Sequence, residues 1–236
     1  MFSTQKTTIL FDLDGTLLPF WQDAFVQRYI HLLVKKLAPL GYDPDLLVRA
    51  VWDCTGAMVK NDGAVTNLEL FWTRFSQLTG WGEERLNPLF LDFYQHEFDG
   101  VRTVLTEQRN LGDFIHGLRQ GGYGLVLATN PLFPPEAVET RLRWVGLTSA
   151  DFDHITTMDN SCHCKPNPAY YRDICDRLHL APEACVMVGN NATEDMAAGE
   201  IGMDTFLITD HLENPFAVET AGFPQGGLAE FAVWLG

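Results

Sequence analysis

Asp12 and Asp14 stand two residues apart near the start of the chain, in the segment FDLDGT over residues 11–16. The β-branched and apolar run over residues 7–11 predicts a buried strand, so both carboxylates leave the strand on the same side. Two close carboxylates repel each other unless a cation or a shared proton offsets the repulsion. The pair therefore suggests a Mg²⁺ site with one carboxylate free for chemistry. The alternative is a solvated turn, since Asp and Gly favour turns.

The composition is that of a folded chain with an acidic surface. The 236 residues fit one large domain or a core with a smaller insert, and 46% hydrophobic residues suffice for a packed interior. The formal net charge is −15, from 31 acidic residues against 16 Lys and Arg. Such a surface repels nucleic acid and anionic membranes, so neither is expected as a partner. An anionic substrate would need a metal or a few placed cations.

The chain start and the cysteines bear on location. Residues 1–6 lack the charged-then-apolar pattern of a signal peptide, and no apolar run approaches the length of a membrane span. Five scattered cysteines are too few for a disulfide framework. We expect a cytoplasmic protein with free thiols; the sequence does not indicate its oligomeric state.

Residues 17–100 carry helical patterns and no convincing strand. Apolar residues recur at helical spacing over residues 23–37, and Pro44 stands at a tolerated first-turn position of a helix predicted through residue 57. Thr66 and Glu69 have the spacing of a capping box for a helix that runs to about residue 78. A fourth helix is predicted within residues 83–98. This stretch is interpreted as an insertion after the first strand.

From residue 101 the pattern alternates between helices and short apolar runs. Strands are predicted over residues 125–128, 154–158, 184–188 and 205–208, and helices over residues 106–119, 134–144, 167–178 and 193–201. This alternation predicts an α/β fold with a parallel sheet covered on both faces. In such folds, ligands bind at the carboxyl ends of the strands.

Polar residues follow several predicted strands. Thr129 and Asn130 end the second strand, Asn190 follows a later one, and Asp195 lies a turn beyond it. Lys165 precedes a predicted helix between these groups. Together with the aspartate pair, these residues offer a carboxylate nucleophile, a proton carrier, hydroxyl and amide donors, a cation and oxygen ligands for Mg²⁺. That set suits phosphoryl transfer.

Four segments, in this order, resemble the four motifs of the haloacid dehalogenase-like hydrolases: FDLDGT at residues 11–16, ATN at 128–130, KP at 165–166 and VGNNATED at 188–195. The helical stretch resembles the cap that one large branch of the family carries after the first motif. The resemblance spans essentially the whole chain. It implies a Rossmann-like three-layer core over residues 1–16 and 101–236, with an all-helical cap over residues 17–100.

The resemblance also implies roles for matching residues. Asp12 would be the nucleophile that forms an aspartyl-phosphate, and Asp14 would protonate the leaving oxygen and then take a proton from water. The cofactor would be Mg²⁺, held by the Asp12 carboxylate, the Asp14 backbone carbonyl and the phosphate. Thr129 and the Asn130 amide would hold the transferring oxygens, and Lys165 would offset negative charge. The acid at position 14 is absent from the dehalogenases of the family, which disfavours dehalogenation.

One residue departs from the pattern of the family. Asn190 stands where many relatives have an aspartate that ligates Mg²⁺ directly, and Asp195 supplies the charge at the matching spacing. An amide oxygen still ligates Mg²⁺, although more weakly than a carboxylate. We therefore expect Asn190 and Asp195 as metal ligands, direct or through water, and a weaker metal affinity. Which of the two completes the site stays open.

Other residues invite functional readings that are less favoured. The run CHC at residues 162–164 lacks the spacing and the partner cluster of a zinc site. Glu194 could be an extra metal ligand, but it is interpreted as a solvated acid at a helix N-terminus. Lys60 and Arg74 are the cap cations considered for contact with an anionic substrate. Six large side chains of the insert could line a substrate pocket, but most are expected to pack in the cap core: Phe20, Trp21, Trp52, Met58, Trp72 and Phe75.

The favoured function is a Mg²⁺-dependent phosphatase that acts on a small phosphorylated metabolite under a cap that excludes solvent. A phosphomutase would use the same two aspartates. A non-catalytic binding protein on a degenerate hydrolase fold is the third alternative, with Asn190 as its only support.

Overall fold

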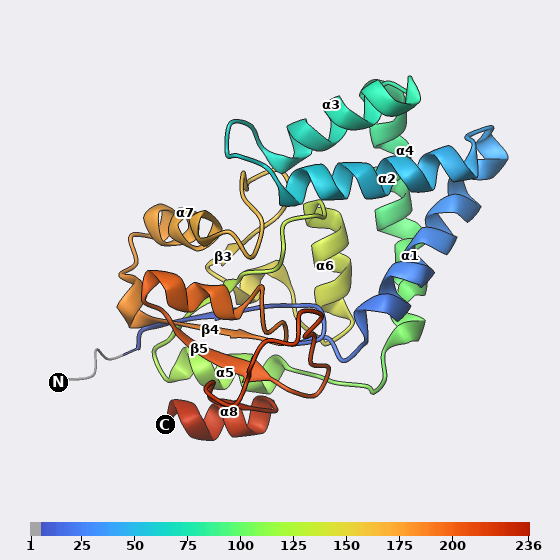
Figure 1. Ribbon diagram of the computed structural model, residues 1–236. Coiled ribbons are helices and arrows are strands. Elements are labelled where there is room, and N and C mark those ends of the chain that lie inside the picture. Colours follow the sequence, from blue (N-terminus) through green and yellow to red (C-terminus); the bar gives the residue numbers. More distant parts are fainter. Residues whose placement is uncertain (1–5) are drawn as a thin grey trace.

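The computed structural model describes residues 6–236. Residues 1–5, which belong to the predicted core and to the argument about a signal peptide, lie outside the described residues. Six parallel strands form one sheet in the order β3-β2-β1-β4-β5-β6 (Figure 1). Their bounds are β1 Thr8–Phe11, β2 Gly124–Leu127, β3 His154–Ile155, β4 Cys185–Gly189, β5 Asp204–Ile208 and β6 Gln225–Gly226.

Helices cover both faces of this sheet. Successive side chains of β1 point to opposite faces, as a strand requires. Leu10 packs on one face with α7 (Pro168–Leu178) and the 3₁₀ helix η5 (Met196–Ile201). On the other face, Phe11 makes edge contacts with Phe114 of α5 (Gly112–Gln120) and Phe231 of α8 (Leu228–Leu235). Figure 1 shows α7 on one side of the sheet and α5 and α8 on the other.

Four helices stand between β1 and α5 in the chain: α1 (Gln22–Leu37), α2 (Pro44–Val59), α3 (Asn67–Thr79) and α4 (Glu83–His96). Local signals set their starts. The Asp43 side chain accepts a hydrogen bond from the Leu46 amide, and Thr66 and Glu69 form the predicted capping box. Figure 1 shows the four helices grouped beside the sheet, with α6 (Pro135–Arg143) between it and α4. The predicted fold, a parallel α/β core with an inserted helical unit, is confirmed; the bounds 17–100 of a cap stay a prediction.

Short 3₁₀ helices complete the chain: η1 (Ala38–Leu40), η2 (Phe98–Val104), η3 (Ser149–Asp151) and η4 (Pro182–Ala184). No helix among residues 6–236 combines the length and the apolar character needed to cross a bilayer.

The structure corrects several predicted elements. The helix expected from residue 106 begins only at Gly112, because the backbone amide and hydroxyl of Thr106 both bond to the Pro19 carbonyl. The helix expected from residue 193 is replaced by a turn and η5, because the Asn191 side chain accepts from the amides of Thr193 and Glu194. The third strand is only two residues long. The strand β6 and helix α8 were not predicted.

Candidate active site

The three central strands end at one edge of the sheet. β1 pairs with β2 on one side and with β4 on the other, all in parallel. Asp12 follows β1, Thr129 follows the end of β2, and Asn190 follows β4. Neighbouring strands on both sides of β1 therefore deliver these polar side chains to the same place, at the point where the strand order reverses.

Lys165 links two of the carboxylates. Its Nζ lies 2.8 Å from Oδ1 of Asp12 and 2.6 Å from Oδ1 of Asp195, and its side chain has no exposed surface. Burial opposes the charge on Lys165, but the two carboxylates outweigh it and hold the pKa of the lysine well above its usual value. Oδ2 of Asp195 accepts from the Asn191 amide, so both oxygens of Asp195 have donors. Burial still raises the pKa of Asp195, to about 6.

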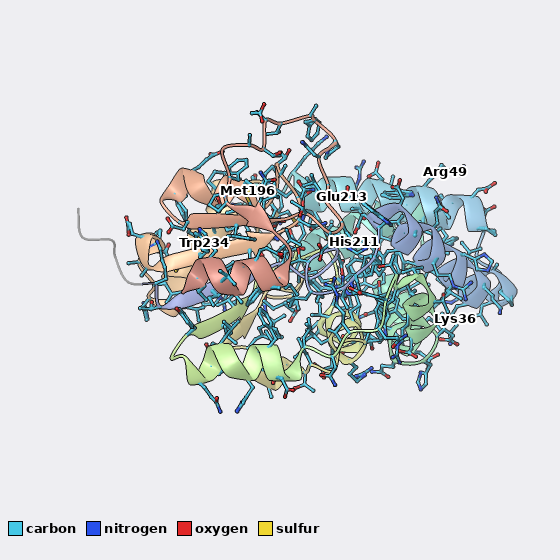
Figure 2. All side chains as sticks on the ribbon, turned by 90° about the horizontal axis from the view of Figure 1, so that it is seen from below. Lys36, Arg49, Met196, His211, Glu213 and Trp234 are labelled. Atoms are coloured by element: carbon cyan, nitrogen blue, oxygen red, sulfur yellow. The ribbon has the colours of Figure 1, made fainter. Side chains whose placement is uncertain are left out.

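Asn190 lies beside Asp12 through a shared donor. The Thr16 hydroxyl is 3.1 Å from Oδ2 of Asp12 and 3.2 Å from Oδ1 of Asn190. The Asn190 amide nitrogen donates to the carbonyl of His211, and its backbone carbonyl accepts from the Glu213 amide, so the loop that carries these two residues in Figure 2 orients the side chain. These contacts turn the amide oxygen of Asn190 towards Thr16 and Asp12.

Gly15 permits this close approach. A Cβ at Gly15 would lie 2.2 Å from Nδ2 of Asn190, and the residue has φ +79°, a conformation that L side chains rarely adopt. Only glycine therefore lets the turn after β1 pack directly against Asn190. The glycine of the segment FDLDGT has a steric function at this site.

Asp14 contacts an arginine that sequence reasoning did not single out. Arg141 of α6 has no exposed surface, and its Nη1 lies 2.5 Å from Oδ2 of Asp14. Its guanidinium also stacks 4.6 Å from the ring centre of Phe133. Burial raises the pKa of Asp14 to about 6, although the charge of Arg141 opposes this rise. Oδ1 of Asp14 is buried with no hydrogen-bond partner among the described residues.

Thr129 and Asn130 lie on the loop after β2. The carbonyl of Thr129, which is almost fully buried, accepts from the hydroxyls of Thr156 and Tyr170 at 2.6 and 2.9 Å. The Asn130 side-chain nitrogen donates to Glu194 at 3.0 Å. Burial, together with Asp195, raises the pKa of Glu194 to about 7. The interpretation of Glu194 as a solvated acid at a helix N-terminus is therefore wrong: its side chain is only partly exposed and accepts a hydrogen bond from Asn130 on the loop after β2.

The CHC run and two cations of the helical insert are the other residues considered from the sequence. His163 of the CHC run pairs with Asp173 at 2.7 Å, and Cys164 accepts from the Asn67 side chain. Within residues 6–236, no three His, Cys, Asp or Glu side chains converge as a metal cluster. Of the cap cations considered, Arg74 pairs with Asp53 at 2.6 Å, and Lys60 is exposed at the end of α2.

The oxygen atoms at this edge of the sheet are better suited as ligands for Mg²⁺ than for zinc. A hydroxyl donates one proton, so Thr16 satisfies either Asp12 or Asn190 at one time and leaves the other oxygen without a donor. The buried, unpartnered Oδ1 of Asp14 adds a further oxygen without a donor. Carboxylate, amide and backbone carbonyl oxygens are the ligands of hard cations. The residues present therefore fit a Mg²⁺ ion.

Of the contacts that sequence reasoning missed, the one made by Arg141 had a usable sequence signal. Arg141 follows Ala137 by four residues, so it lies on the apolar stripe of α6 together with Val138 and Leu142, where a cation needs a buried partner. Thr16 stands within the FDLDGT segment, but nothing in that segment indicates that its hydroxyl joins Asp12 to Asn190. The chemical roles assigned to the site residues stay predictions.

Comparisons with known proteins agree with this arrangement. The family described as haloacid dehalogenase-like hydrolase matches residues 6–201. Pyrophosphatase PpaX from Bacillus velezensis is 26% identical over 205 residues, which cover 87% of this chain and 84% of that protein. A phosphoglycolate phosphatase from Aliivibrio fischeri is 29% identical over 203 residues, which cover 85% of this chain and 83% of that protein.

A solved structure shows the same fold. The HAD-hydrolase YfnB from Bacillus subtilis, bound to magnesium, superimposes with a TM-score of 0.57 at 22% identity, over 98% of this chain and 99% of that chain. The fold, the family match and the phosphatase-named relatives together confirm the prediction of a phosphatase-like hydrolase. The chain belongs to the haloacid dehalogenase-like hydrolase family.

Proposed function

We propose that the protein is a Mg²⁺-dependent phosphatase that hydrolyses a small phosphorylated metabolite through an aspartyl-phosphate on Asp12. The observation that carries this proposal is the pairing of Asp12 with Lys165 beside the Thr16–Asn190 contact, at the edge where β1, β2 and β4 end. Two relatives are named for pyrophosphatase and phosphoglycolate phosphatase activity, which supports phosphate transfer to water as the reaction.

The nucleophile in this proposal is Asp12. Its Oδ1 accepts from Lys165 and its Oδ2 accepts from Thr16, so hydrogen bonds at both ends fix the plane of the carboxylate. A fixed carboxylate is oriented for attack on phosphorus in line with the leaving oxygen. Bond formation from Asp12 to phosphorus breaks the bond from phosphorus to the leaving oxygen, and water then cleaves the acyl-phosphate.

Asp14 is proposed to carry the proton. It stands two residues from Asp12, and its raised pKa means that a neutral carboxyl remains accessible near neutral pH. In the first step it gives its proton to the leaving oxygen. In the second step it takes a proton from the attacking water. Asp14 therefore loses one proton in the first step and regains one in the second.

Mg²⁺ would be held by the Asp12 carboxylate, the Asp14 backbone carbonyl, the Asn190 amide oxygen and, directly or through water, Asp195. When bound, the ion supplies positive charge that offsets the repulsion between the nucleophile and the phosphate. Lys165 adds a fixed cation to the same region, and Thr129 and the Asn130 amide are proposed to hold the phosphate oxygens.

The five free cysteines support the expected cytoplasmic location.

The test is the substitution Asp12→Asn, which keeps the shape of the side chain and removes the nucleophile. Release of phosphate from 4-nitrophenyl phosphate should require Mg²⁺ and should fall more than about a thousandfold in the variant. The matched control is Asp113→Asn, an exposed aspartate on α5. Acid-quenched wild-type enzyme should carry a phosphoryl group on Asp12 by peptide mass. Full activity in Asp12→Asn would overturn the proposal.

A further inference from the structure

A cavity of about 470 Å³ lies between helices α1 to α4 and the loop that follows β2. Most of its lining side chains are aromatic or aliphatic, among them Trp52, Met58 and Trp72, three of the six large residues that the sequence placed mainly in the cap core. Leu132, Phe133 and Pro134 line it from the loop after β2. Its size is that of a site for a small organic molecule, about 300–1,000 Å³.

One buried side chain, Arg141, lies between the wall of the cavity and Asp14. Phe133 lines it and stands three residues after Asn130, whose carbonyl accepts from the Leu132 amide. The guanidinium of Arg141 stacks over Phe133 and bonds to Asp14. Arg141 therefore connects the wall of the cavity with the candidate site through Asp14.

The lining of the cavity carries almost no charge. Among the described residues, no lysine, arginine or histidine lines it, and Asp23 is its one charged lining residue. The hydroxyls of Tyr29 and Tyr94 bond to each other at 3.0 Å, so part of the polar lining is already satisfied. Arg141 is paired with Asp14 and is not among the lining residues. An anion bound in this cavity would lose its hydrating water and would find no cation to pair with.

We propose that this cavity receives the leaving group of the substrate, and that the leaving group is uncharged and largely aromatic or aliphatic. The inference rests on the proposed function and narrows it. Pyrophosphate and phosphoglycolate both carry a second anionic group, so the substrates named for two relatives would be poor ones for this chain. The enzyme would act on a phosphate monoester of an apolar alcohol or phenol.

Binding of phosphonates tests this without turnover, because their carbon–phosphorus bond is not cleaved by a phosphatase. Calorimetry with Mg²⁺ present should show that affinity rises about fourfold for each methylene from methylphosphonate to hexylphosphonate. The reason is that burial of each methylene contributes about 0.8 kcal/mol to the binding free energy. Phosphonoacetate, which carries a carboxylate, should bind no tighter than methylphosphonate. A flat alkyl series, or phosphonoacetate that binds tighter than propylphosphonate, would overturn the inference.

A matched pair of variants locates the effect. Thr55 lines the cavity on α2, whereas Thr73 is exposed on α3 and does not line it. Thr55→Lys should weaken hexylphosphonate at least tenfold and tighten phosphonoacetate, while Thr73→Lys should change neither. Equal effects of the two variants would show that the alkyl groups bind elsewhere.

The outcome also separates the two proposals. A flat alkyl series with phosphate release that depends on Asp12 overturns the cavity inference alone. If affinity rises along the alkylphosphonate series but no phosphate is released from any substrate, the proposed function is overturned. The cavity is then still a site for uncharged apolar groups.

Discussion

Nη1 of Arg141 lies 2.5 Å from Oδ2 of Asp14, and the arginine side chain is completely buried. Its other terminal nitrogen, Nη2, has no hydrogen-bond partner among the described residues. The stacking of the guanidinium on Phe133 and Phe25 compensates part of the lost hydration. A buried cation of this kind is stable only beside its carboxylate partner. Asp14 therefore contributes to the stability of the fold as well as to the candidate active site.

Arg141→Met should therefore lower the free energy of unfolding by about 3 kcal/mol, because it leaves a buried carboxylate without its cation. Urea denaturation of the metal-free protein measures this. Arg143→Met on the same helix is the control, since Arg143 is exposed, and its effect should stay within about 0.5 kcal/mol. The double variant with Asp14→Asn should lose less than the sum of the two single losses, by about 1 kcal/mol or more. Strict additivity would contradict a direct pair.

Asp14→Asn should separate proton transfer from metal binding. The substitution removes the carboxyl that carries the proton but keeps the backbone carbonyl proposed for Mg²⁺, so kcat should fall about 100-fold or more. The Mg²⁺ concentration for half-maximal activity should stay within about twofold of the wild-type value. Steady-state rates over a Mg²⁺ titration measure both quantities. Unchanged kcat with a large shift in the Mg²⁺ midpoint would contradict this division of roles.

The stability of the metal-free protein should depend on pH through its buried acids. The pKa of Glu194 is raised from 4.5 to about 7 and that of Asp14 from 3.8 to about 6, in both cases mainly by burial. Between about pH 4 and pH 7 the folded state therefore holds protons that the unfolded state has released. These two groups therefore lower the free energy of unfolding as pH rises through this window.

Glu194→Gln should flatten that slope by up to about 1.4 kcal/mol per pH unit, the contribution of one group. Urea denaturation at half-unit steps from pH 4.5 to 7.5, without metal, measures the slope. The control is Glu200→Gln, because Glu200 is exposed on η5. A slope equal to that of the wild type in Glu194→Gln would show that other groups govern the dependence.

Much of the fold was predictable because its signals are local. The capping box of Thr66 and Glu69 marks the start of α3, and a run of four buried residues, most of them apolar, marks β1. The edge that gathers Asp12, Thr129 and Asn190 was predictable as well, since parallel strands end at a common edge. Weak local signals explain the failures: β6 is a two-residue strand with the sequence Gln-Gly, and no periodicity reveals it.

The contacts that sequence reasoning missed are long-range. Arg141 and Asp14 are 127 positions apart, and no local pattern pairs them. Thr16 and Asn190 are 174 positions apart, and their contact depends on how the loop with His211 turns the Asn190 amide. Spacing predicts which residues arrive at an edge, but it does not indicate which atoms then touch.

Asn190 and Asp195 occupy different environments, and this difference predicts opposite responses to substitution. The amide oxygen of Asn190 shares the Thr16 hydroxyl with Asp12, whereas both oxygens of Asp195 have donors, from Lys165 and from the Asn191 amide. Asn190 is therefore the better candidate for a direct Mg²⁺ ligand, and Asp195 for a residue that positions Lys165 and acts on the metal through water.

Asn190→Asp should lower the Mg²⁺ concentration for half-maximal activity several-fold, because hard cations prefer charged oxygens. The same change adds a carboxylate beside Asp12, so without Mg²⁺ the variant should unfold at lower urea than the wild type. Asp195→Asn should raise the Mg²⁺ midpoint about tenfold, as loss of an outer partner does at other metal sites. Titration of activity against Mg²⁺, with urea denaturation in parallel, measures each effect. An unchanged midpoint in Asn190→Asp, with the destabilisation present, would remove Asn190 from the ligand set and leave Asp195 to complete the site.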